Sequence, residues 1–327
     1  MIHFISFKRI SKEAGILIIL LTIALLFEVT GWFIVGQSFL FNPKRLFLMI
    51  LQVSVIGLIA VGVTQIIITG GIDLSSGSIV ALSAVVAASF AQTTGATRPV
   101  YVHLLDLPVI IPLTAGIGLG CVCGFFNGWL IAKTKIPPFI ATLGMMVSAR
   151  GFAQFYTAGK PVSMLTNSYL FIGAGFMPVF IYLLFAAMAY ILLRKTRYGK
   201  YIYAIGGNET AAIVSGINVV KYKILVYTFA GALAGLAGVV LSARVNSGQA
   251  SMGVSFELDA IASAVIGGTS LSGGIGTIPG TLIGSLVLGL VQSGFTFLRI
   301  NAYIQEIIKG FIIIGAVVMD MMRTKKD

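Results

Sequence analysis

Long runs of apolar residues, separated by short polar stretches, recur along almost the whole chain. A helix needs about 20 mainly apolar residues to cross the hydrocarbon core of a bilayer. That length predicts an all-α, polytopic transmembrane bundle of about ten helices. Their predicted ranges are 15–36, 46–69, 78–91, 107–132, 138–156, 173–193, 222–243, 258–266, 277–298 and 303–322. The third and the eighth are short, so they are either half-helices completed by neighbours or re-entrant pieces among about eight full spans.

Two breaks rich in glycine and serine interrupt this pattern. Residues 69–78 read Thr-Gly-Gly-Ile-Asp-Leu-Ser-Ser-Gly-Ser, and residues 267–274 read Gly-Gly-Thr-Ser-Leu-Ser-Gly-Gly. Paired glycine-broken segments in one membrane chain are typical of a transport pathway. Both breaks are predicted on the same side of the membrane, which favours inner hinges or gates. The candidate pathway or gate residues are Asp73, Ser75, Ser76, Thr269, Ser270 and Ser272.

Asp73 has two interpretations. An ionised carboxylate at membrane depth costs about 3 kcal/mol on insertion scales unless it has a partner. At the inner surface the cost nearly vanishes, and Asp73 would cap the following helix together with Ser75 or Ser76. In the other interpretation, Asp73 and the nearby hydroxyls would line a gate for a neutral polyol.

Composition and charge support a membrane protein. Hydrophobic residues make up 57% of the 327 residues and charged residues 10%, with a mean hydropathy of +1.01. The formal net charge of +12 does not indicate nucleic-acid binding, because the basic residues flank apolar runs. Their distribution predicts that both termini are cytoplasmic. A smaller outer set could meet an acidic soluble partner: Lys44, Arg45, Arg98, Lys160, Arg244 and Arg299.

No pattern in the chain indicates an enzyme. There is no metal-ligand cluster, no nucleophile with a paired base, and no Gly-x-x-x-x-Gly-Lys-Ser/Thr phosphate-binding motif. Glu306 and Lys309 lie three apart in the last span and are expected to pair with each other. Arg150 is expected to make an interhelical contact.

The largest predicted cytoplasmic break covers residues 194–223. Asn208 suits a helix N-cap, Glu209 suits the first turn, Ala211 and Ala212 favour helix, and Gly216 can end it. These residues predict a short amphipathic helix along the inner surface, although an ordinary connecting loop would also fit.

Small residues also recur every fourth position. Such faces let helix backbones approach closely in lipid, either within one subunit or at a dimer seam. The positions are Gly116, Gly120, Gly124, Gly128, Gly231, Gly235, Gly276, Gly280 and Gly284.

Several motifs in order resemble the permease subunits of bacterial ATP-binding-cassette sugar importers of ribose type. They are residues 69–78, Pro-Phe-Ile-Ala-Thr-Leu-Gly at 138–144, Ala-Arg-Gly at 149–151, 199–212, 215–219 and 257–274. Ser76 departs from the apolar residue usual in the family's first motif. The resemblance runs from about residue 46 to 320 and implies one transmembrane permease domain, 1–327, in the bacterial inner membrane.

The resemblance also implies the partners. The permease would work as a dimer, expected to be a homodimer, and receive a monosaccharide from a periplasmic binding protein. ATP and Mg²⁺ would be held by a separate ATPase subunit, so no cofactor or metal is expected on this chain. The residues expected to couple to that ATPase are Gly207, Asn208, Glu209, Ala211, Ala212 and Gly216.

One alternative function remains open from the residues alone. A secondary transporter of about ten helices, powered by protons or sodium, would need carboxylates that bind the coupling ion. The candidates for that role are Asp73, Asp259 and Glu306.

Overall fold

The computed structural model describes residues 12–324. Its helices are α1 Lys12–Ile34, α2 Pro43–Ile68, α3 Ser76–Phe90, α4 Ile110–Thr134, α5 Pro138–Thr157, α6 Asn167–Gly173, α7 Met177–Lys195, α8 Arg197–Gly207, α9 Glu209–Val214, α10 Val219–Val245, α11 Phe256–Ile266, α12 Ile278–Phe297 and α13 Ala302–Thr324. Two short strands, β1 Val162–Ser163 and β2 Ser247–Gly248, pair antiparallel. The all-α transmembrane fold is confirmed.

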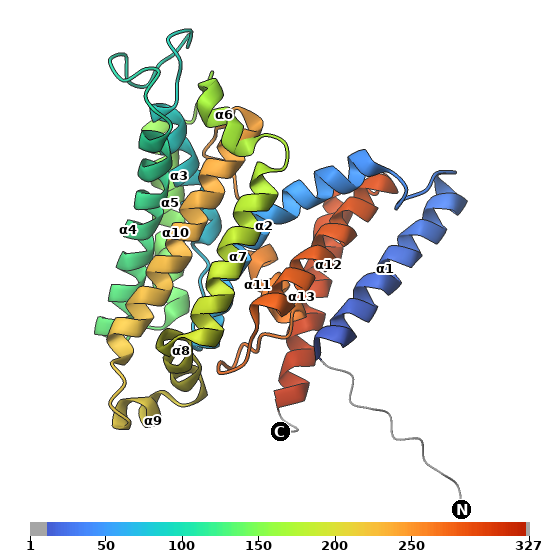
Figure 1. Cartoon of the computed structure of the whole chain (residues 1–327), viewed down its shortest axis with the longest axis vertical. Coiled ribbons are helices and arrows are strands. Elements are labelled where there is room, and N and C mark those ends of the chain that lie inside the picture. The colour runs from blue at the N-terminus through green and yellow to red at the C-terminus, as the bar shows by residue number, and fades with distance from the viewer. Residues whose placement is uncertain (1–11, 325–327) are drawn as a thin grey trace, which may run out of the picture.

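Seven helices of the described chain are long and apolar enough to cross a bilayer: α1, α2, α4, α7, α10, α12 and α13. Two of the predicted spans, α3 with 15 residues and α11 with 11, are short, as the sequence indicated. Figure 1 places the start of α1 and the end of α13 on the same side as α8 and α9. The loop between α3 and α4 lies on the opposite side, beside α6.

Helices α2, α3 and α10 form the centre of the bundle. Nearly every residue of α3 is buried, and more than half of the most apolar window of α2 and of α10 is buried. By contrast α1 and α13 keep most of their surface exposed, as expected of helices that face lipid or another chain. The core is therefore organised around helices that have no amphipathic pattern, because a helix that is apolar all round can be covered by other helices.

The glycine faces pack within this one chain. A Cβ on Gly120 of α4 would meet the carbonyl oxygen of Gly231 on α10, and one on Gly124 would meet that of Tyr227. On α12, a Cβ on Gly284 would meet the Ser263 carbonyl of α11. Backbone contacts this close need glycine, so the intrasubunit interpretation is confirmed at these positions.

The turn between α1 and α2 is held by a carboxylate within the first span. Glu28 Oε2 accepts hydrogen bonds from Phe39 N at 2.9 Å and Leu40 N at 2.7 Å. Ser38 Oγ donates to the same oxygen at 3.0 Å. Arg45 Nη1 also stabilises the turn, because it donates hydrogen bonds to the carbonyls of Ser38 and Phe39, each at 3.0 Å. Glu28 is thus explained by the backbone groups that it satisfies.

A matched pair of glycine substitutions on α4 tests the packing. Gly120→Ala should lower the free energy of unfolding by about 1–3 kcal/mol, because the new methyl group meets backbone rather than a movable side chain. Gly118→Ala should have little effect, since nothing lies within 4 Å of that added Cβ. Thermal unfolding of the purified protein in detergent measures the difference. Equal midpoints for the two variants would contradict this packing.

Candidate functional site

The first glycine break is a buried turn between α2 and α3. Asp73 Oδ1 accepts hydrogen bonds from Ser75 N at 2.8 Å and Ser75 Oγ at 2.6 Å. Asn127 Nδ2 of α4 donates to Ser75 Oγ at 2.9 Å. Ser75 occupies the N-cap position of α3 but makes no side-chain capping bond. The carboxylate therefore stabilises its own turn and does not cap α3, while the buried Ser76 Oγ has no hydrogen-bond partner.

The second break is held by a carboxylate that the sequence reading did not single out. Asp320 Oδ2 on α13 accepts from Leu271 N at 2.9 Å and from Ser270 Oγ at 3.1 Å. Gly273 and Gly274 both have positive φ, +86° and +73°, a conformation that glycine adopts without strain. This break thus depends on α13 as well as on its own turn.

The two breaks were predicted on the same side of the membrane, and in the structure they also contact each other. Gly274 N donates to the carbonyl oxygen of Ile68, the last residue of α2, at 2.9 Å. Gly206 of α8 packs against the same junction, since a Cβ there would collide with Ile68 O and Gly274 N. Segments far apart in the chain therefore form one junction of α2, α8 and the loop between α11 and α12.

Helix α8 is anchored to this junction by two tyrosines. Tyr203 donates to the Gly276 carbonyl at 2.7 Å, and Tyr198 donates to Gln65 Oε1 at 2.9 Å. Burial raises the pKa of both phenols, so they remain neutral donors. Helix α8 is not among the predicted elements, although Tyr198 and the buried Ile202 and Ile205 are spaced as on one face of a helix.

The short helix predicted after Asn208 is present as α9. Asn208 Oδ1 accepts from Ala211 N at 2.9 Å, and Glu209 pairs with Lys223 at 2.7 Å. Gly216, with φ +81°, ends the helix, and Ile217 N bonds to Ala212 O at 3.0 Å as in a Schellman motif.

One face of α9 is unpaired with the rest of the chain. Ala212 is buried beside Ile205 and Val219, whereas Ile213 and Val214 are 57% and 84% exposed. Two neighbouring apolar side chains on a polar loop form a small surface that could pack against another protein.

A cavity of about 830 Å³, lined by both polar and apolar side chains, lies toward the face opposite α8 and α9. Its walls are the turn after α1, the first half of α2, the second half of α12 and the first half of α13, together with the end of α10 and the start of α11. Three of the basic residues predicted on the outer side line it: Arg45, Arg244 and Arg299. None of the six residues predicted to line a pathway or gate does so.

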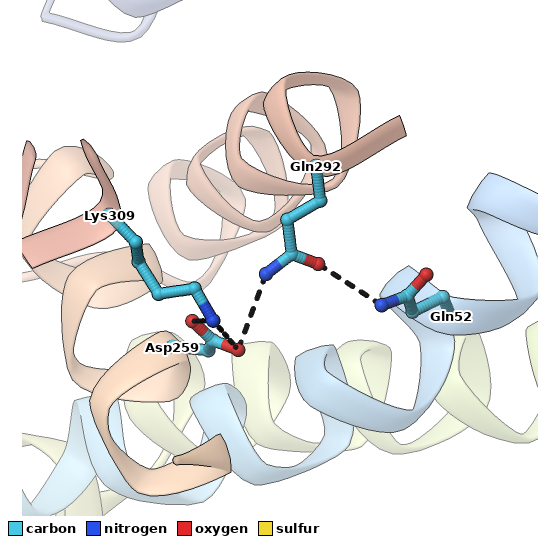
Figure 2. Close-up of polar contacts among 4 residues, drawn as sticks. All are labelled: Gln52, Asp259, Gln292 and Lys309. Atoms are coloured by element: carbon cyan, nitrogen blue, oxygen red, sulfur yellow. Dashed lines mark hydrogen bonds and ion pairs between the residues drawn. The ribbon is translucent and has the colours of Figure 1, made fainter. Parts of the chain in front are cut away.

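Four side chains from four helices form a network in this cavity (Figure 2). Lys309 Nζ on α13 lies 3.0 Å from Asp259 Oδ1 on α11. Gln292 Nε2 on α12 donates to Asp259 Oδ2 at 3.3 Å, and Gln52 Nε2 on α2 donates to Gln292 Oε1 at 3.1 Å.

The expected pairing of Lys309 with Glu306 is wrong. Lys309 instead pairs with Asp259, whose side chain is only 3% exposed. A buried carboxylate gains far more from a cationic partner than Glu306, which lines the open cavity. Sequence spacing could identify only partners on the same helix, and the carboxylate that matters lies on another.

Arg150 also differs from its expected role. Its Nη1 donates to the carbonyls of Ala250 at 2.5 Å and Met252 at 2.6 Å, in the non-helical segment between β2 and α11. Arg150 therefore holds irregular backbone rather than a neighbouring helix. Among the described residues, no cluster of three or more His, Cys, Asp or Glu could hold a metal ion.

The chain is similar in sequence to a family of known transport proteins. Residues 45–317 match the family described as branched-chain amino acid transport system / permease component. The chain belongs to this permease family. The ribose import permease of Escherichia coli K12 is 42% identical over 289 residues, 86% of each chain. The ribose import permease of Bacillus subtilis is 40% identical over 298 residues, 89% of this chain and 88% of the relative.

A third relative, the galactose/methyl galactoside import permease of Escherichia coli K12, is 35% identical over 332 residues, 97% of this chain and 96% of its own. No solved structure matches the chain. The resemblance drawn from the motifs, to ribose-type permease subunits of ATP-binding-cassette sugar importers, is confirmed. The permease is a multi-pass membrane protein.

A double-mutant comparison tests the ion pair. Lys309→Met should lower the free energy of unfolding by about 3 kcal/mol, because it leaves Asp259 buried without its partner. The double variant Asp259→Asn with Lys309→Met should regain most of that loss. Glu306→Gln is the control and should unfold at the wild-type temperature in detergent. A larger effect from Glu306→Gln than from Lys309→Met would refute the observed pairing.

Proposed function

We propose that this permease moves a monosaccharide, delivered by a periplasmic binding protein, across the bacterial inner membrane. ATP with Mg²⁺ is hydrolysed on a partner ATPase subunit, and this chain binds no cofactor. Residues 1–327 act as one transmembrane domain, paired with a second, identical copy. Both termini and the α8–α9 segment face the cytoplasm, and the outer basic residues meet acidic patches on the binding protein.

The observation that supports this function is the contact of α8 with both glycine breaks. The exposed face of α9 is the docking site for the ATPase, with Gly207 to Gly216 as the coupling segment. Since α8 ends at the junction of Ile68, Gly206 and Gly274, a displacement of α9 moves both breaks together. The breaks act as an inner gate, and their glycines permit the movement.

The six residues predicted for the gate take part in different ways. Asp73, Ser75 and Ser76 are buried in the first turn, whereas Ser270 is tied to α13 and Ser272 is exposed. Thr269 is fully buried, and its Oγ1 has no hydrogen-bond partner. Buried polar atoms without partners are costly, and opening of the gate would satisfy them.

The ion-coupled alternative is not favoured. The relatives are import permeases, and Asp259, one of its candidate coupling carboxylates, is neutralised by Lys309. Uptake that requires ATP and the partner subunits, and not an ion gradient, separates the two mechanisms.

Substitution of the exposed apolar face of α9 tests ATPase coupling. Val214→Arg should reduce ATP-driven sugar uptake more than about tenfold, because a charge replaces a contact expected to be central in the interface. Val214→Ile keeps the apolar surface and should retain uptake. Transport is measured in proteoliposomes with the ATPase and the binding protein, and wild-type uptake by Val214→Arg would show that α9 is not the docking helix.

Asp73→Asn tests whether charge at the gate matters. The amide oxygen of asparagine can still accept from Ser75 N and Oγ, so membrane assembly should be unchanged. If the carboxylate is part of the gate, uptake by the assembled transporter should fall. Assembly is checked by size-exclusion chromatography, and normal uptake would leave Asp73 with a structural role only.

A further inference from the structure

We infer that Gln52, Gln292, Asp259 and Lys309 form a recognition site for sugar hydroxyl groups inside the permease, used in transit after the binding protein releases its ligand. This inference rests on the proposed import function. It assigns substrate contact to residues outside both glycine breaks, and it implies that the permease contributes to selectivity.

The network has the donors and acceptors that a polyol needs. A hydroxyl group donates one hydrogen bond and accepts others, so it can insert between the Gln52 and Gln292 amides, now joined at 3.1 Å. Asp259 Oδ2 accepts from Gln292 Nε2 at 3.3 Å and from Lys309 Nζ at 3.2 Å, both long enough to be exchanged for a bond from a sugar hydroxyl. Carboxylates and side-chain amides that converge from separate helices fix the orientation of a bound ligand.

The charge of the network favours a neutral ligand. Asp259 and Lys309 cancel each other, so the network itself carries no net charge; the three arginines and Glu306 belong to the rest of the cavity wall. A buried ion pair rarely adds stability compared with apolar residues of similar size. Its position on the wall of a cavity, rather than in the close-packed centre of the bundle, points to a function in binding.

The location suits a ligand that enters from the binding-protein side. The cavity lies toward the face opposite α8 and α9, and within its lining Gln52 is exposed whereas Asp259 is buried. Phe256, Phe295 and Phe297 supply apolar wall area that can cover the C–H face of a sugar ring. At about 830 Å³ the cavity can hold a monosaccharide together with water, as expected of a site that binds weakly and releases quickly.

The test uses the complete importer in proteoliposomes, with ATPase and binding protein, and a panel of labelled aldopentoses and aldohexoses that includes ribose and galactose. Gln52→Leu and Gln292→Leu keep the side-chain size but remove the hydrogen-bonding groups. Each should reduce uptake about three- to tenfold and change the ratio of uptake between sugars. ATP hydrolysis stimulated by the loaded binding protein should persist, because α9 and the gate are untouched. Gln154→Leu, an exposed glutamine of α5 that does not line this cavity, is the matched control.

Uptake and sugar ratios equal to those of the control would overturn the inference and leave the proposed function intact. An equal loss of uptake for every sugar, with a lower unfolding temperature, would assign the glutamines a structural role and would also overturn it. Wild-type importer that takes up none of the sugars with ATP would instead refute the proposed function, and the inference with it.

Discussion

Backbone groups at membrane depth must find their hydrogen-bond partners within the protein, and the centre of this permease is built around that requirement. Where α2 stops, the Ile68 carbonyl accepts from Gly274 N of the other break. In the segment before α11, Arg150 donates hydrogen bonds to the carbonyls of Ala250 and Met252. Irregular segments are therefore tolerated in the bundle only because distant parts of the chain satisfy them.

The two faces at opposite ends of the helix bundle differ in structure. Toward one face lies the cavity that holds the four-residue network, and toward the other the breaks pack against α8. Helix α13 contacts both regions, since Lys309 belongs to the cavity network and Asp320, about three turns further on, holds the second break. Most of the surface of α13 is exposed. These two polar attachments therefore help to fix its position.

Close backbone contacts explain why glycine is needed at Gly206 and at Gly120. A side chain at Gly206 would separate α8 from the breaks, and one at Gly120 would separate α4 from α10. Rigid helix pairs packed through glycine surround a junction whose own glycines adopt positive φ. Movement is therefore more easily accommodated in the breaks than in the α4–α10 pair.

The sequence by itself determined the membrane class, most spans, both breaks and α9, because hydropathy, capping and glycine conformation act over a few neighbouring residues. Asn208 and Gly216 occupy the predicted ends of α9 for that reason. Only the tertiary structure decided that Lys309 pairs with Asp259, that Arg150 holds a loop, and that a cavity exists. These features bring together residues that lie tens of positions or more apart in the sequence. Lys309 pairs with Asp259 because Asp259 is buried, and no local sequence pattern shows which carboxylate will be buried.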